Sequence, residues 1–455
     1  MHLGKDKNFG GLESRDQWGS RWGFIIACVG SAVGMANVWA FPYRAARYGG
    51  SSYLIPYIIC VVVLGCTGVV SEIAFGRWGR SGPYATFRKA LTERGKPLKN
   101  IGLIPVVGSF AMATGYAIIM GWVLRYLWGS LSGAMFAAED VGAYFGAICG
   151  DFGSFGWHML ALATGFAMAT AGISKSIERV CKVMMPLFYV MFIYMAVRVA
   201  MMPGASEGYK YLFILPDAKH LLNPETWIFA LGQAFFSLSL AGNGTIVYGS
   251  YLDKKENVLF CSMNIAVFDT LAAMLAAIVV IPAVFAFGLD PASGPPLMFI
   301  TLPMIFREMT GGMMFAIIFF AAILFAAATS LVNLLETPIE MIQERFGFSR
   351  PVSVGLVITA VLLAAPAAAL CGVFLENGNV IGEWMDVVSI YVCPVGAFIA
   401  AFIFYWIMGP RFAREQIGLG RGGLVPAWIL PLGKYLYCGI ALLVLALGIM
   451  LGGIG

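Results

Sequence analysis

Long apolar runs divide this 455-residue chain almost from end to end. A helix needs about 20 mainly apolar residues to cross the hydrocarbon core of a bilayer. Eleven runs reach that length, at residues 22–48, 52–77, 101–129, 156–174, 183–202, 226–251, 258–288, 311–341, 351–373, 383–409 and 424–453. The chain is therefore predicted to be an all-α integral membrane protein with 11 transmembrane helices.

The composition excludes several other classes of protein. Hydrophobic residues make up 60% of the chain and charged residues 12%, whereas soluble domains have about 45–50% and about 25%. Such a chain is neither a soluble fold nor a disordered segment, and its net charge of +5 does not suggest nucleic-acid binding. Most of its nine cysteines fall inside apolar runs, as small core residues do, so a disulfide scaffold is not expected. The three histidines are far apart and lack the spacing of metal ligands.

Basic residues predict the orientation, because Lys and Arg gather in cytoplasmic loops. They are concentrated in the N-terminal segment and in the loops at 77–99, 175–182, 253–256, 344–350 and 411–421. These loops share one side if the N-terminus is cytoplasmic, and an odd number of spans then places the C-terminus outside. The polar N-terminal segment does not resemble a cleavable signal peptide.

Two predicted spans contain small and polar residues where Leu or Val would be expected. The first carries Gly, Ser and Asn between residues 30 and 37, and the sixth does so between residues 237 and 244. These residues could form a face for close helix packing. Alternatively, both helices are broken, which is tolerated inside a membrane where the backbone lines a cavity or binds something. Breaks at matching places in two five-span halves predict an inverted-repeat transporter of one domain, 1–455, with repeats at 21–202 and 226–409 and an extra helix at 424–453.

Several motifs resemble those of the neurotransmitter:sodium symporter family. They are RWGF at 21–24, GMANVWAFPY at 34–43, Gly49-Gly50, EIAFGR at 72–77, GISKSIER at 172–179, QAFFSLSL at 233–240, FITLP at 299–303, and Thr329-Ser330 followed by Glu336. The resemblance covers ten of the 11 predicted spans. The count of 11 is similar to that of the bacterial amino-acid transporters of the family, which implies a multi-pass protein of the bacterial inner membrane.

The resemblance implies two sodium sites, since a hard cation takes several oxygen ligands. The first site would use the Ala32 carbonyl, Asn37, Ser237, Asp269 and the carboxylate of the substrate. The second would use the carbonyls of Gly30, Val33 and Ala326 with the hydroxyls of Thr329 and Ser330. The residues alone leave open that these two hydroxyls bond back to their own helix.

Asp269 stands inside an apolar span, where a lone carboxylate costs about 3 kcal/mol or more. A functional role is the default interpretation of such a residue. Many members of the family need chloride near this position, and a fixed carboxylate would supply the same negative charge. The sequence therefore predicts that chloride is not required.

The resemblance also implies a substrate pocket. Its expected lining is Met35, Ala36, Met112, Tyr116, Phe236, Ser237, Ser239, Gly242, Ser330 and Leu334. Tyr116 would donate to the carboxylate of the substrate, because its place within a span argues against an interfacial tyrosine. Monoamine transporters of the family carry Asp where this chain has Gly34, so the expected substrate is an amino acid, neutral and hydrophobic. Gly242 would widen the pocket and Ala36 would narrow it.

The outer gate departs from the family pattern, because Ala40 replaces an Arg that usually pairs with an acid on the tenth helix, here Asp386. An unpaired acid near a pocket is costly. Either Arg44 or Arg47 compensates for it, or a cationic substrate does. A transporter of the same type specific for a lysine- or arginine-like amino acid is therefore the alternative hypothesis.

The remaining gate residues also follow from the resemblance. Phe236 and Tyr116 would form a thin outer lid. Arg15 and Glu344 would form the inner ion pair, with Trp18 as a plug and Tyr251 nearby, although Arg15 also fits the ordinary excess of cytoplasmic positive charge. Glu72 and Glu336 are expected to hold the broken helices by hydrogen bonds, with ion binding as the less favoured role.

The sequence thus predicts a sodium-coupled secondary active symporter, acting by alternating access as a monomer or homodimer. A membrane enzyme would need a nucleophile–base pair or a metal cluster, and neither pattern is present in the sequence. A channel would not need a closed substrate pocket with two gates.

Overall fold

The computed structural model describes residues 17–214, 217–240, 243–290 and 297–452. Within these ranges every regular element is a helix. The first part contains α1 (Arg21–Ala32), α2 (Met35–Val38), α3 (Ala40–Arg47), α4 (Ser51–Leu64), α5 (Val70–Gly79), α6 (Pro83–Glu93), α7 (Leu103–Ser132), α8 (Ala134–Ala137), α9 (Val141–Ile148), α10 (Phe155–Thr170), α11 (Glu178–Ala200), α12 (Ala205–Phe213) and α13 (Ala218–Leu221).

The second part contains α14 (Pro224–Ser237), α15 (Gly244–Ser250), α16 (Val258–Ala286), α17 (Leu302–Glu308), α18 (Gly312–Phe346), α19 (Arg350–Ala369), α20 (Gly378–Val387), α21 (Cys393–Phe402), α22 (Pro410–Gly418), α23 (Ile429–Pro431) and α24 (Cys438–Leu451). Short π-helical turns join several of these helices into longer rods. One such turn, Gly65–Val69, links α4 to α5, so that a single span runs from Ser51 to Gly79.

Length and apolarity identify eight helices able to cross a membrane among the described residues, or nine if the bent pair α1 and α2–α3 is one span. The sequence predicts eleven. The two further predicted spans coincide with α10, which has only 16 residues, and with the interrupted pair α14 and α15. None of these three helices is long enough by itself to be counted as a membrane span.

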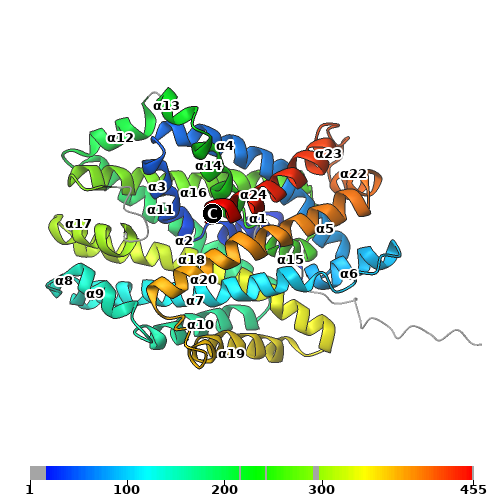
Figure 1. Ribbon diagram of the computed structural model, residues 1–455, viewed down its shortest axis with the longest axis horizontal. Coiled ribbons are helices and arrows are strands. Elements are labelled where there is room, and N and C mark those ends of the chain that lie inside the picture. The colour runs from blue at the N-terminus through cyan, green and yellow to red at the C-terminus, as the bar shows by residue number, and fades with distance from the viewer. Residues whose placement is uncertain (1–16, 215–216, 241–242, 291–296, 453–455) are drawn as a thin grey trace, which may run out of the picture.

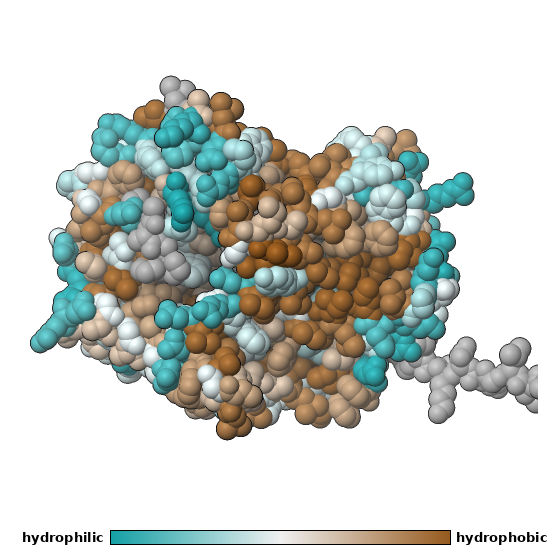
Figure 2. Space-filling model, in the orientation of Figure 1, coloured by the Kyte–Doolittle hydropathy of each residue, from teal (hydrophilic) through white to brown (hydrophobic). Residues whose placement is uncertain are grey.

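The outer surface of the bundle is apolar, as a lipid-facing surface must be. On α11, Val183, Val190 and Val197 lie seven residues apart and are 63%, 60% and 56% exposed. Figure 2 shows brown, hydrophobic residues across the middle of the visible face and teal, hydrophilic ones toward the two ends of the long axis. This distribution suits a bilayer crossed by the long helices, which run roughly along that axis in Figure 1.

Long straight helices form the frame around the interrupted ones. α18 packs on α7, α14 packs on α4, and α15 packs on α5. α1, which ends at the first break, packs on α11, α16 and α18. The frame therefore surrounds the breaks, where backbone groups are freed.

The contact between α5 and α15 depends on glycine. A Cβ atom added to Gly76 would lie 1.9 Å from the carbonyl oxygen of Ile246, and one added to Gly249 would lie 2.6 Å from that of Ile73. Backbone atoms cannot rotate away as a flexible side chain can. The two helices are therefore in direct backbone contact.

We expect Gly76→Ala to lower the free energy of unfolding by roughly 1–3 kcal/mol, because the added methyl group forces α5 and α15 apart. The measurement is the thermal unfolding of the purified protein in detergent. Gly355→Ala on α19 is the matched control, since no atom lies within 4 Å of its added Cβ. Equal melting temperatures for the two variants would contradict this prediction.

Candidate functional site

The interruption of the first predicted span is present in the structure. α1 ends at Ala32, α2 begins at Met35, and the two parts of the span are bent by 66°. Gly34 is extended at the break, and its N–H donates to Asn37 Oδ1 at 3.1 Å. The last carbonyls of α1 have no following helical N–H group, as is general at helix ends.

The second interruption separates α14 from α15. Ser239 and Asn243 have left-handed backbones, with φ of 57° and 50°, which end the helical hydrogen bonding on either side of the gap. Ser239 Oγ donates to the Ser31 carbonyl at 3.0 Å, so the two breaks lie against each other.

A cluster of buried polar side chains lies beside the first break. Asp269 on α16 accepts from Asn37 Nδ2 at 2.8 Å and from Ser237 Oγ at 2.6 Å. All three residues are at most 2% exposed, and Tyr57 Oη is 3.5 Å from Ser237 Oγ. Ala32, the fourth expected ligand of the first sodium site, ends α1 and lines the neighbouring cavity. Within the described residues Asp269 has no basic partner, so its negative charge is available to a cation.

A second oxygen cluster lies where α18 crosses the end of α1. Thr329 Oγ1 is 2.7 Å from the carbonyl oxygen of Gly30, and it also lies 3.1 Å from that of Ala326 on its own helix. Ser330 Oγ lies 3.2 Å from the Gly30 carbonyl and 3.4 Å from that of Val33. The two hydroxyl groups can donate only two hydrogen bonds, whereas more than two carbonyl oxygens lie around them. A cation bound between these oxygens would satisfy the remaining ones. Thr329 bonds both to its own helix and across to α1.

A cavity of about 880 Å³ opens at the breaks. Nine of the ten residues expected from the sequence line it: Met35, Ala36, Met112, Tyr116, Phe236, Ser237, Ser239, Ser330 and Leu334. The tenth, Gly242, lies outside the described residues. Other parts of the wall were not anticipated: Trp122 lies six residues after Tyr116 on α7, and Asn333 lies three after Ser330 on α18. Helical spacing could have found these two, but nothing local predicts Phe145 or Phe299, which come from α9 and from the turn before α17.

Hydrogen-bond donors at one end of the cavity could bind an anion. The N–H group of Met35, at the start of α2, donates to Tyr116 Oη at 3.0 Å, which leaves the tyrosine proton to donate elsewhere. A Cβ added to Gly34 would lie 2.7 Å from Tyr116 Oη and 3.3 Å from Ser330 Oγ. The missing side chain at residue 34 therefore keeps open the space between these hydroxyls.

Two acidic side chains on α20, Glu383 and Asp386, line the same cavity, as does Ala40 on α3. Arg44, one turn beyond Ala40, is buried, donates to Gln233 Oε1 at 2.7 Å, and interacts electrostatically with Asp386. Arg47 is exposed and bonds to Tyr43 Oη at 2.6 Å instead. Of the two arginines considered from the sequence, Arg44 is thus the one whose positive charge acts on Asp386.

The opposite end of the bundle is closed by aromatic and charged side chains. Trp18 Nε1 donates to the Tyr248 carbonyl at 3.0 Å and packs edge-on against Phe24 and Tyr248. Glu344 accepts from the N–H group of Gly82 at 3.3 Å. Its expected partner, Arg15, lies outside the described residues.

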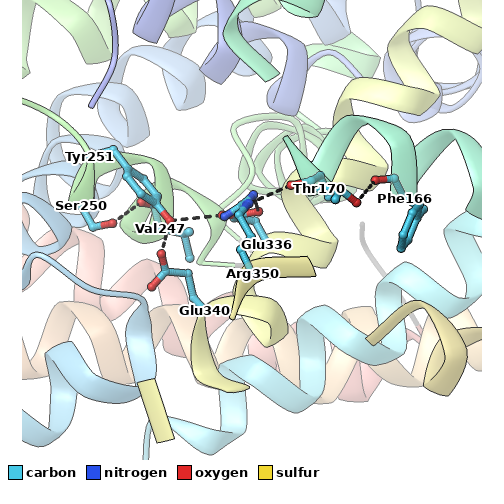
Figure 3. Close-up of polar contacts among 9 residues, drawn as sticks. Phe166, Thr170, Val247, Ser250, Tyr251, Glu336, Glu340 and Arg350 are labelled. Carbon is cyan, nitrogen blue, oxygen red and sulfur yellow. Dashed lines mark hydrogen bonds and ion pairs between the residues drawn. The ribbon is translucent and has the colours of Figure 1, made fainter. Parts of the chain in front are cut away.

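Tyr251 reaches from the end of α15 to two carboxylates on α18, as Figure 3 shows. Its hydroxyl lies 3.2 Å from Glu336 Oε1 and also contacts Glu340. Arg350 at the start of α19 forms two parallel hydrogen bonds to Glu336, both of 2.8 Å. The network therefore joins α15, α18 and α19.

Glu72 on α5 holds the other side of the second break. It is buried and accepts from Asn243 Nδ2 at 2.9 Å and from Thr245 Oγ1. These contacts position the start of α15, which agrees with the structural role expected from the sequence.

Comparisons with known proteins place the chain in a group of transporters. Its sequence matches the model of the sodium:neurotransmitter symporter family over residues 15–151 and 144–418. The sodium-dependent transporter YhdH of Bacillus subtilis (strain 168) is 34% identical over 323 residues, which cover 70% of this chain and 71% of YhdH. A sodium-dependent transporter of Haemophilus influenzae is 30% identical over 82% of this chain and 83% of its own length.

The structure agrees with these sequence relations. The crystal structure of MhsT in complex with L-phenylalanine has a TM-score of 0.84 and 31% identity, and the match covers 96% of this chain and 100% of MhsT. Sequence and fold together show that the chain is a multi-pass membrane protein and belongs to the sodium:neurotransmitter symporter family.

Proposed function

We propose that this protein is a sodium-coupled symporter that imports a neutral, hydrophobic amino acid by alternating access. The observation that carries the proposal is the junction of the two breaks. There the cavity meets both oxygen clusters, and one of these contains the unpaired carboxylate of Asp269.

Two sodium ions fit the two clusters. The first would bind Asp269, Asn37, Ser237 and the Ala32 carbonyl, and the second would bind Thr329, Ser330 and the carbonyls of Gly30, Val33 and Ala326. Each charge that moves inward gains about 2.3 kcal/mol per 100 mV, so two ions would gain roughly twice that. If the substrate carboxylate completes the first site, each ligand raises the affinity for the other by the same factor.

The apolar wall supports a hydrophobic substrate. Met35, Met112, Phe236 and Leu334 face the cavity beside the carboxylate-binding end, and the similar protein MhsT was crystallised with L-phenylalanine. A lysine- or arginine-like substrate is less well supported, because Arg44 already supplies a positive charge to Asp386. Phe236 and Tyr116 would close over the bound substrate.

The same proposal includes the topology: 11 spans with repeats at 21–202 and 226–409, a cytoplasmic N-terminus and an outer C-terminus. Conversion between states would open the end closed by Trp18, Tyr251, Glu344 and Arg15 while the Asp386 side closes. The site would lie in a bacterial inner membrane, in a monomer or a homodimer.

Uptake into liposomes containing the purified protein tests the function. An inward Na⁺ gradient should drive accumulation of labelled phenylalanine or leucine, whereas K⁺ should not. Excess unlabelled lysine or arginine should compete weakly, and replacing chloride by gluconate should leave the rate unchanged, because Asp269 supplies the negative charge. Uptake without Na⁺ dependence would refute the symport mechanism, and uptake confined to lysine or arginine would favour the cationic alternative.

Thr329→Val should weaken sodium binding, since it keeps the shape of the side chain but removes an oxygen ligand. We expect the half-saturating Na⁺ concentration to rise roughly tenfold or more, measured by the Na⁺-dependent rise in melting temperature. Thr164→Val is the matched control, because its hydroxyl bonds to the Ala161 carbonyl of its own helix, α10, at 2.7 Å. An unchanged Na⁺ requirement in the Thr329 variant would remove this residue from the site.

Arg44→Gln should impair closure of the outer side, because it removes the cation that acts on Asp386. We expect the maximal uptake rate to fall about tenfold, with Asp386→Asn giving a similar fall and the double variant no further loss. Arg47→Gln, at the exposed neighbour, should retain the rate. Additive losses in the double variant would show that the two side chains act separately.

A further inference from the structure

A second cavity, of about 610 Å³, lies at the end of the bundle that carries Trp18 and Glu344. Three separate elements form it: α6, the loop before α7, and the last turn of α18. Each contributes one cation to the wall, namely Arg88, Lys99 and Arg345.

These three positive charges have no carboxylate partner in the part of the chain that the structure describes. No acidic residue lines the cavity. The potential inside the cavity therefore favours an anion.

One of the three cations, Arg345, is held in place by a buried tyrosine. Tyr84 at the start of α6 is 2% exposed and accepts a hydrogen bond from Arg345 Nη1. The Arg345 guanidinium also lies 5.8 Å from the ring of Tyr84. On the other side, a Cβ added to Gly102 would lie 2.7 Å from Tyr84 Cα, so the loop passes directly against α6.

The rim of this cavity is apolar on the side of the bilayer. Leu98 is 64% exposed in the wall itself. Farther along the chain, α7 begins at Leu103, and Ile104 and Val107 are 36% and 58% exposed. The basic cavity thus lies where α7, a helix long and apolar enough to cross a membrane, begins, and lipid headgroups gather at the ends of such helices.

We propose that this cavity binds the phosphate of an anionic phospholipid, with the acyl chains lying along Ile104 and Val107. Basic pockets between transmembrane helices bind such headgroups, and the apolar rim favours a lipid over a free phosphate ion. The bound lipid would clamp the loop before α7 to the end of α18, the helix that carries Thr329 and Ser330. This inference does not depend on the identity of the transported substrate.

Binding of lipid to the delipidated protein tests the proposal. The protein in detergent is titrated with dioleoylphosphatidylglycerol, with dioleoylphosphatidylcholine, or with inorganic phosphate, and bound lipid is counted by native mass spectrometry. We expect the anionic lipid to bind at least about tenfold more tightly than the zwitterionic one. The triple variant Arg88→Gln, Lys99→Gln and Arg345→Gln should lose that preference.

A second triple variant, Lys254→Gln, Arg411→Gln and Arg414→Gln, is the control, since it removes the same charge from exposed positions outside the cavity. It should keep the preference for the anionic lipid. Equal affinities in the two triple variants would overturn the proposal, and displacement of the lipid by millimolar inorganic phosphate would assign the cavity to a free anion. The melting temperature of each variant verifies that it is folded. If the first triple variant fails to fold, Arg345→Lys alone, which preserves the charge, should retain most of the binding of the anionic lipid.

Discussion

The structure depends on one constraint: backbone groups freed inside an apolar bundle must find partners there. The last carbonyls of α1 and the gap between α14 and α15 are surrounded by helices rather than by water. Hydroxyls on α18, the amide of Asn37 and the hydroxyl of Ser239 are the partners of such backbone groups at the first break. A break without these side chains would cost several kcal/mol for each unsatisfied group. The site therefore lies where the fold must concentrate its polar side chains.

Two buried carboxylates of the bundle, those of Glu336 and Asp269, differ in the charge of their hydrogen-bond partners. Glu336 is neutralised by two parallel hydrogen bonds from Arg350, which makes it part of the frame. Asp269 is equally buried, but the donors that reach it among the described residues, Asn37 and Ser237, are neutral. A carboxylate left in that condition gains more from a cation than a paired one does. This contrast is the physical reason for proposing Asp269, rather than Glu336, as a sodium ligand.

The two ends of the bundle also differ. Glu383, Asp386 and Ala40 border an open cavity, and Arg44 lies one helical turn beyond Ala40 on α3. At the other end, Trp18 and Tyr251 are packed among helices and bonded to them. Charged side chains therefore border the cavity at the Asp386 end, whereas tightly packed and hydrogen-bonded side chains fill the other end.

The sequence by itself determined the class of the fold and the places of both interruptions, because apolar length and mid-span Gly, Ser and Asn are local properties of the chain. It also determined nine residues that line the cavity, through the family motifs that carry them. Tertiary structure alone decided that Arg44 and not Arg47 acts on Asp386, that Phe145 and Phe299 reach the cavity, and that Arg88, Lys99 and Arg345 share a second one. These juxtapositions join segments far apart in the chain, and no local pattern encodes how helices separated by 200 residues pack.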